Sequence, residues 1–127
     1  MDCIYREIST SIDDIALLSS IYQHVYIPEF PDPNERESLE NMQRYLTLKA
    51  EGWYGKNNYH IVAAMDGERA LGLAVFDYLA DSNCGVIEFL MTTSDARQTG
   101  LGARLRAYAE EILSADAQRN GKALACV

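Results

Sequence analysis

Three strand-like segments follow one another in the middle of the chain, with only short turns between them. They cover residues 59–65, 71–79 and 85–93, and each is rich in β-branched, aromatic and other apolar residues. Asp66-Gly67 separates the first two segments with the chemistry of a type I′ hairpin turn, and Asp81-Ser82-Asn83 separates the second two. Strands joined by such short turns pair antiparallel, so the sequence predicts a three-stranded antiparallel meander.

The chain before the meander predicts a short strand followed by a helix. Residues 3–8 have the β-favouring composition of a first strand. Ser11 and Asp14 stand three residues apart, as in a capping box, and predict a helix start. Apolar residues then recur at spacings of three and four in one stripe, which ends before Pro28.

All three prolines of the sequence fall within residues 27–34, which predicts an irregular loop there. A second, short amphipathic helix is expected to start from this loop, with Asp32 as its N-cap, Pro33 in its first position and Glu35 reaching back. Gly52 is expected to end this helix.

A long periodic helix and a returning strand follow the meander. The apolar stripe of this helix comprises Leu101, Leu105, Tyr108, Ala109, Ile112 and Leu113. Asn120-Gly121 ends the helix, and residues 122–127 predict a fifth strand, parallel to its neighbour because a crossover helix connects them. The order β-α-α-β-β-β-α-β predicts an α+β fold, α/β three-layer-like, in which helices flank a mixed, mostly antiparallel sheet. We expect one domain over residues 1–127.

Composition narrows the kinds of partner. The formal net charge is −8, which disfavours nucleic acids and anionic membranes, and no stretch approaches the roughly 20 apolar residues of a membrane helix. Cys3, Cys84 and Cys126 are odd in number, far apart and without a CxxC pair, which fits neither a disulfide framework nor a zinc site. We therefore expect small, buried cysteines in a cytoplasmic protein that has no metal site.

The stretch Arg97-Gln98-Thr99-Gly100-Leu101-Gly102 lies between the meander and the long helix. Glycines let the backbone approach a ligand closely, and the unpaired amides of a first helical turn, together with the helix dipole, attract anions. A diphosphate would fit such a loop. No Gly-Lys-Ser/Thr follows, and Leu105 stands where a dinucleotide fingerprint has its third glycine. A tight turn that merely begins a helix is the alternative interpretation.

In this position, Arg97-x-x-Gly100-x-Gly102 resembles the (Gln/Arg)-x-x-Gly-x-(Gly/Ala) motif of GNAT-type N-acetyltransferases. The stretch Glu88-Phe89-Leu90-Met91-Thr92 resembles the fourth strand of that family. The resemblance implies that the loop amides hold the pyrophosphate of acetyl-coenzyme A, the cosubstrate, and that the strand lines its pantetheine arm. The residues so assigned are Leu90, Met91, Thr92, Arg97, Gln98, Thr99, Gly100, Leu101, Gly102 and Ala103.

Glu88 is the candidate general base for acetyl transfer to a primary amine. It interrupts an apolar run, where desolvation would raise the pKa of its carboxyl group and make it a better base. The alternative is that Glu88 is structural, bonded to an arginine or to backbone. His60 could also act as a base, although a packed or surface role is more common for a single histidine on a strand, and His24 looks structural.

The loop and second helix commonly form one wall of the acceptor site in this family, which makes Glu29 and Phe30 candidate acceptor-binding residues. Carboxylates outnumber cations between Ile27 and Glu51, which would favour a cationic amine on a small molecule or peptide. A solvated helix face with intrahelical ion pairs is the alternative.

A complete domain of the resembled family continues past its fifth strand, whereas this sequence stops at Val127. The continuation normally carries the tyrosine that serves as general acid. We therefore expect a C-terminally incomplete domain whose exposed sheet edge can pair in a homodimer. The predicted function is N-acetyl transfer by a direct ternary-complex mechanism. The alternative is a non-catalytic acyl-coenzyme A-binding or interaction module.

Overall fold

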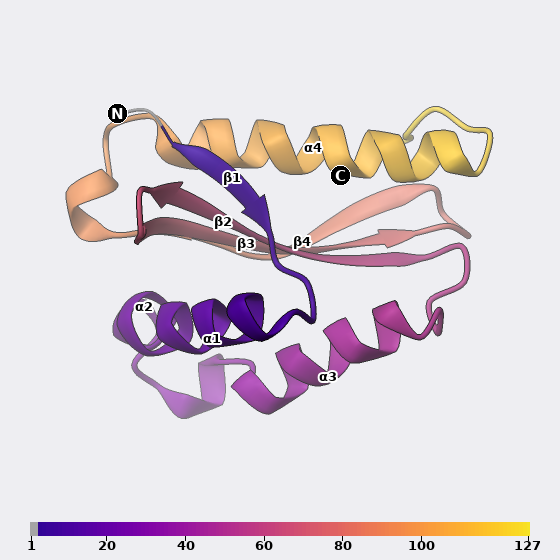
Figure 1. The fold of residues 1–127 in the computed structure, drawn as a ribbon. Helices are drawn as coiled ribbons and strands as arrows, with labels where there is room; N and C mark the ends of the chain where they lie inside the picture. Colours follow the sequence, from indigo (N-terminus) through magenta and orange to yellow (C-terminus); the bar gives the residue numbers. More distant parts are fainter. Residues whose placement is uncertain (1–2) are drawn as a thin grey trace.

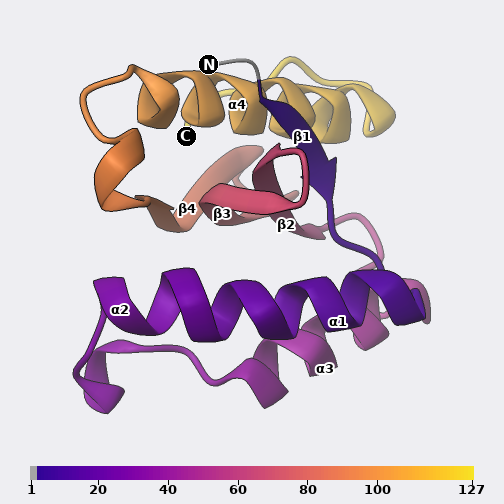
Figure 2. The same ribbon diagram turned by 60° about the vertical axis from the view of Figure 1, so that its left-hand side comes forward.

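The computed structural model describes residues 3–127 as three layers, with a sheet between two sets of helices (Figures 1 and 2). Four antiparallel strands pair in the order β1-β2-β3-β4. The strands are β1 (Ile4–Glu7), β2 (Asn58–Asp66), β3 (Arg69–Leu79) and β4 (Cys84–Thr92). The helix α4 (Leu101–Arg119) covers one face of the sheet; α1 (Ile12–Ile21), α2 (Ile27–Glu29) and α3 (Leu39–Ala50) lie on the other. The predicted α+β class and its antiparallel meander are confirmed.

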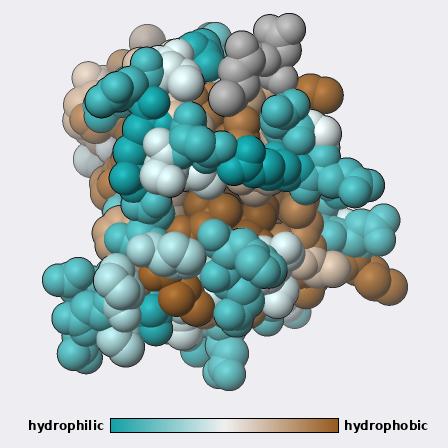
Figure 3. Space-filling model, turned by 90° about the vertical axis from the view of Figure 1, so that its left-hand side faces the viewer, coloured by the Kyte–Doolittle hydropathy of each residue, from teal (hydrophilic) through white to brown (hydrophobic). Residues whose placement is uncertain are grey.

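Side chains that alternate along the strands fill two separate apolar clusters, one on each face of the sheet. On one face, Leu105 and Leu113 of α4 are fully buried against residues such as Phe76. On the other, α1 and α3 pack on Tyr59 and Val75. From the side, a band of apolar surface lies between two hydrophilic surfaces (Figure 3). The sheet is therefore buried on both faces, and its edges and strand ends remain for a site.

The first helix starts as predicted but ends later. Asp14 N–H donates to Ser11 Oγ, which caps α1. The helix then continues through a π-helical segment, Tyr22–Tyr26, into α2. Pro28 falls in the first turn of α2, where a missing N–H costs little, so the expected stop before Pro28 and a wholly irregular loop after it are wrong.

The second helix begins at Ser38, not at Asp32. Asp32 caps only the single 3-10 turn Pro33–Glu35, after which the backbone is extended. The hydroxyl of Tyr22 donates to the carbonyl of Glu37, and Glu37 N–H donates to the hydroxyl of Tyr26. Because these bonds to the first helix engage both backbone groups of Glu37, the helix starts only after this residue.

The first hairpin turn is also shifted by one residue. Asp66 pairs with Arg69, so the two-residue loop is Gly67-Glu68, with a positive φ of 61° at Gly67. Glycine in the first central position is the preference of a type II′ turn, and the predicted type I′ turn at Asp66-Gly67 is wrong.

The predicted fifth strand does not form in the described residues. Beyond Gly121 the chain makes one parallel bridge, between Cys126 and Cys84, and these two cysteines form a disulfide with a Cα–Cα distance of 4.7 Å. Gly85 N–H donates to the Cys126 carbonyl at 2.8 Å. The parallel direction is as predicted, but the expectation of three unpaired, buried cysteines is wrong, and only Cys3 is free. Cys84 and Cys126 are 42 residues apart in the sequence, and this spacing does not show that α4 returns the chain to the start of β4.

None of the helices within residues 3–127 has the length and apolar character needed to span a membrane.

Candidate functional site

The loop before α4 turns sharply and ends at a left-handed glycine. Gly100 is the N-cap of α4 and is left-handed, with a φ of 82°. Gln98 also has a positive φ, 68°, although it carries a side chain. Thr99 Oγ1 accepts from Leu101 N–H and donates to the Ala96 carbonyl, which ties the loop to itself. Two positive φ values within three residues turn the backbone sharply just before α4.

The amides that open α4 are available to a ligand. The first helical bond runs from Arg104 N–H to the Gly100 carbonyl, so the amides of Gly102 and Ala103 precede the first helical donor. Arg104 donates its guanidinium to the Thr99 carbonyl and braces the loop. A Cβ atom at Gly102 would meet only Leu90 Cδ2, at 3.8 Å, so the fold itself does not require glycine there. Because packing does not require glycine at position 102, its presence is consistent with close approach of a ligand to the backbone there.

A cavity of about 240 Å³ lies beside this loop. Three separate segments line it, namely the end of the first helix, the second half of β4 and the loop of residues 97–102 before α4, which is called the phosphate loop after its predicted role. The lining residues are Glu29, Phe30, Leu90, Met91, Thr92, Arg97 and Gly102. Every one of them is a predicted site residue, and the structure brings the predicted cofactor and acceptor residues together in one place.

Two contacts shape this cavity. The Phe30 ring packs against Tyr26 and Phe89, with ring centroids 5.6 and 6.1 Å apart, which fixes the apolar wall. Arg97 donates to the Glu29 carboxylate in an ion pair that joins the phosphate loop to α2. The only cation lining the cavity is thus paired with the only carboxylate lining it.

The remaining predicted cofactor residues, Gln98, Thr99, Gly100, Leu101 and Ala103, belong to the adjoining loop and first helical turn and do not line the cavity. The Leu101 side chain is fully buried in the core under α4. Leu101 can therefore meet a ligand only through its backbone.

Glu88 lies at a bulge in β4. Phe76 pairs with Ile87 and Val75 pairs with Phe89, so Glu88 is the extra residue that has no partner in the ladder. Its side chain is exposed and does not line the cavity; it stands two residues before Leu90, which corresponds to about 7 Å along a strand. Partial desolvation and the neighbouring Asp77 carboxyl raise the pKa of Glu88 to about 8. A carboxyl group with this pKa is suited to accept a proton near neutral pH.

Asp77 of β3 is the residue that sequence reasoning missed. Burial raises the pKa of Asp77, and its interaction with the neighbouring Glu88 carboxyl acts in the opposite direction. The signal was present, because Asp77 interrupts the apolar segment 71–79 in the way that Glu88 interrupts its own. The pairing of the two carboxyls depends on strand register, which the sequence does not show.

His60 is engaged in a buried network and does not face the cavity. Its Nδ1 lies 2.8 Å from Glu7 Oε2 and its Nε2 lies 2.6 Å from Asp116 Oδ2. Lys49 Nζ also donates to Glu7 at 2.7 Å. Burial alone would raise the pKa of Glu7, but the hydrogen bonds and charges of His60 and Lys49 outweigh it and lower this pKa to about 2. Since both ring nitrogens are occupied, His60 joins β1, β2 and α4 and is a poor candidate for the base.

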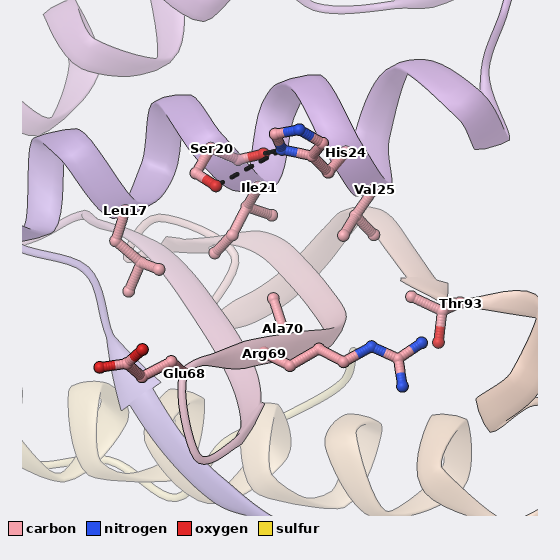
Figure 4. Close-up of a pocket in the computed structure, with 9 residues that line it drawn as sticks. All are labelled: Leu17, Ser20, Ile21, His24, Val25, Glu68, Arg69, Ala70 and Thr93. Carbon is pink, nitrogen blue, oxygen red and sulfur yellow. Dashed lines mark hydrogen bonds between the residues drawn. The ribbon is translucent and has the colours of Figure 1, made fainter.

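Another cavity, of about 440 Å³, lies elsewhere, between α1 and the start of β3 (Figure 4). Two of its polar side chains have partners in the protein, whereas Thr93 Oγ1 is buried without a hydrogen-bond partner among the described residues. His24 Nδ1 lies 2.9 Å from the Ser20 carbonyl, as predicted for a structural histidine, and Arg69 pairs with Asp95. This cavity shares no lining residue with the phosphate-loop cavity.

An antiparallel sheet lies between helices, and a loop with two glycines joins its last strand to the following helix, an arrangement consistent with an acyltransferase domain of the GNAT type. The family model described as "Acetyltransferase (GNAT) family" matches residues 18–125. The chain belongs to this family. No curated protein matches the sequence. Members of the family generally use acetyl-coenzyme A.

Proposed function

We propose that this chain is an N-acetyltransferase that transfers an acetyl group from acetyl-coenzyme A directly to a primary amine in a ternary complex. The observation that carries the proposal is the cavity beside the phosphate loop, where residues from three segments of the chain meet. Acetyl-coenzyme A, when bound, supplies the acetyl group as an activated thioester.

The residues of the cavity fit the charge and shape of this cosubstrate. The free amides of Gly102 and Ala103, the positive end of α4 and the Arg97 guanidinium suit a diphosphate. The outer edge of β4 pairs with the described chain only at Cys84, so backbone groups from Leu90 to Thr92 are free to bind the amides of an extended arm.

Glu88 is the proposed general base. Its position on the same strand as Leu90, together with its raised pKa, allows its carboxylate to take the proton that the attacking amine must lose. Glu29 and Phe30 form the acceptor side of the cavity. Their carboxylate and aromatic ring suit a cationic or partly apolar amine.

Two measurements test this proposal. Turnover of a panel of primary amines is measured as release of the free coenzyme A thiol, and binding of acetyl-coenzyme A is measured by calorimetry. Glu88→Gln is expected to reduce kcat by about 10²- to 10⁴-fold and to leave the Kd for acetyl-coenzyme A unchanged. Glu111→Gln is the matched control, because Glu111 is an exposed residue on α4 without an ion pair in the described structure.

Each alternative outcome contradicts a distinct part of the proposal. Turnover that survives Glu88→Gln would remove Glu88 from the role of base. Tight binding of acetyl-coenzyme A by a wild-type protein that acetylates no amine would instead support a non-catalytic acyl-coenzyme A-binding module. Absence of binding would refute the cofactor site itself.

A further inference from the structure

Asp77 and Glu88 belong to adjacent strands and face the same side of the sheet. Asp77 pairs with Val86, and Glu88 lies two residues further along β4. Diagonal neighbours of this kind are roughly 7–8 Å apart along the backbone, within reach of two acidic side chains. Because Ile87 packs under α4, Glu88 points to the opposite face, where Asp77 also lies above the cluster that contains Val75. The register of β3 against β4 therefore places the two carboxyls side by side on one face.

No cation neutralises this pair. Within residues 3–127, neither Asp77 nor Glu88 makes an ion pair with a lysine or arginine. Among the neighbouring ionisable groups, His60 on β2 acts on Asp77, and Glu37 before α3 acts on Glu88. The pair in turn acts on Tyr54, in the turn after α3, and on Tyr59 of β2.

Tyrosines lie near the pair, whose Asp77 side chain is half-buried while that of Glu88 is exposed. Tyr59 is 2% exposed, and its ring stacks on Tyr54 at 6.1 Å and meets Tyr45 edge-on at 5.5 Å. Desolvation, followed by the charge of Asp77, raises the pKa of Tyr54 to about 12, so this phenol keeps its proton. Two adjacent carboxyl groups do not readily ionise together, because their negative charges repel. The pair therefore keeps one proton, which the two groups share.

We propose that Asp77 is a positioning residue for the general base: its carboxylate accepts the hydrogen bond of the protonated Glu88 carboxyl and sets the pH above which Glu88 can act. The inference rests on the proposed function. Above that pH, Glu88 gives the shared proton to solvent. During turnover the Glu88 carboxylate takes the proton lost by the amine and again donates it in the hydrogen bond to Asp77. Asp77 itself touches no substrate.

Removal of the Asp77 charge should therefore make Glu88 a weaker base. In Asp77→Asn, the pKa of Glu88 is expected to fall from about 8 toward the ordinary value of 4.5. The acid limb of the kcat profile then moves to lower pH by more than one unit. Above pH 9 the kcat of Asp77→Asn should be lower than that of the wild type, because a weaker base accepts the proton of the amine less readily.

The first test needs no substrate and so does not depend on the proposed function. Carboxyl ¹³C resonances of glutamate side chains are titrated by NMR in the wild type, in Asp77→Asn and in Asp66→Asn. Asp66 is the control, since it carries the same group at the exposed end of β2. Glu88 should titrate near pH 8 in the wild type and in the control, and more than one unit lower in Asp77→Asn. Titration of wild-type Glu88 near its ordinary value would overturn the inference.

The second test follows kcat against pH in the same variants. A shifted acid limb in Asp77→Asn supports a positioning role. An equal loss of kcat at every pH, with the limb unmoved, would show that Asp77 is only structural. If Asp77→Asn does not fold, Asp77→Glu replaces it and should retain the raised pKa of Glu88. A wild type without turnover would refute the proposed function, and the NMR titration would still decide the role of Asp77.

Discussion

The ion pair between Arg97 and Glu29 makes a quantitative prediction about cofactor affinity. Arg97 must turn from the Glu29 carboxylate to a diphosphate if the loop binds acetyl-coenzyme A, so Glu29 competes with the cosubstrate. The Arg97 side chain is 51% exposed and that of Glu29 is 22% exposed. A pair this accessible to solvent contributes about 0.2–1 kcal/mol. Glu29→Gln should therefore tighten binding of a coenzyme A analogue by about 1.5- to 5-fold.

Loss of the cation should have a larger effect in the opposite direction. A hydrogen bond to a charged group is worth about 1.5–3 kcal/mol, so Arg97→Gln should weaken binding by about 10- to 150-fold. In the double variant, Glu29→Gln should bring no gain, because no arginine remains to be released.

Calorimetric titration with desulfo-coenzyme A measures these affinities without turnover. Glu35→Gln is the control, because Glu35 carries the same charge nearby, is exposed and makes no ion pair in the described structure. An equal gain in Glu35→Gln would show a general effect of net charge. Weaker binding by Glu29→Gln would refute the competition outright and would make Glu29 a cosubstrate ligand.

Three further predictions concern stability. Gly85→Ala would place a Cβ atom 2.3 Å from Leu113 Cδ1 and should lower the free energy of unfolding by about 1–3 kcal/mol in urea; a loss below about 0.5 kcal/mol would contradict this. The pKa of Glu7 is about 2 against an ordinary 4.5, so its carboxylate contributes stability that is present above pH 4.5 and lost as the pH falls toward 2. Glu7→Gln should therefore make the free energy of unfolding less dependent on pH over that range, as measured by circular dichroism. Replacement of Cys84 and Cys126 by serine should cost about 2–4 kcal/mol of unfolding free energy, and reduction of the wild type should reproduce this loss; equal stability before and after reduction would show that the disulfide contributes nothing.

Signals contained in a few consecutive residues predicted most of the elements. Ser11 caps α1, the long helix runs from Leu101 to Arg119, and the meander has the expected strands. The phosphate loop lies between β4 and α4 as its glycines indicated, with Gly100 in a left-handed conformation. Caps, turns and helix periods act between residues that are close along the chain, so sequence alone is enough to read them.

The predictions that failed depend on residues that are distant along the chain. Two tyrosines of the first helix hold Glu37 and delay the start of α3, although Asp32 and Pro33 carry a valid local start signal. The Cys84–Cys126 disulfide requires α4 to bring the chain end back to β4.

The chemistry of the candidate base was also decided by tertiary structure. The sequence by itself determined that a glutamate would interrupt the fourth strand and that a loop with two glycines would follow it. Only the register of β3 against a bulged β4 placed Asp77 beside Glu88, and only the fold joined Arg97 to Glu29. Electrostatic coupling falls off within a few ångströms, and distances of that size between remote residues are set by packing, which no local pattern records.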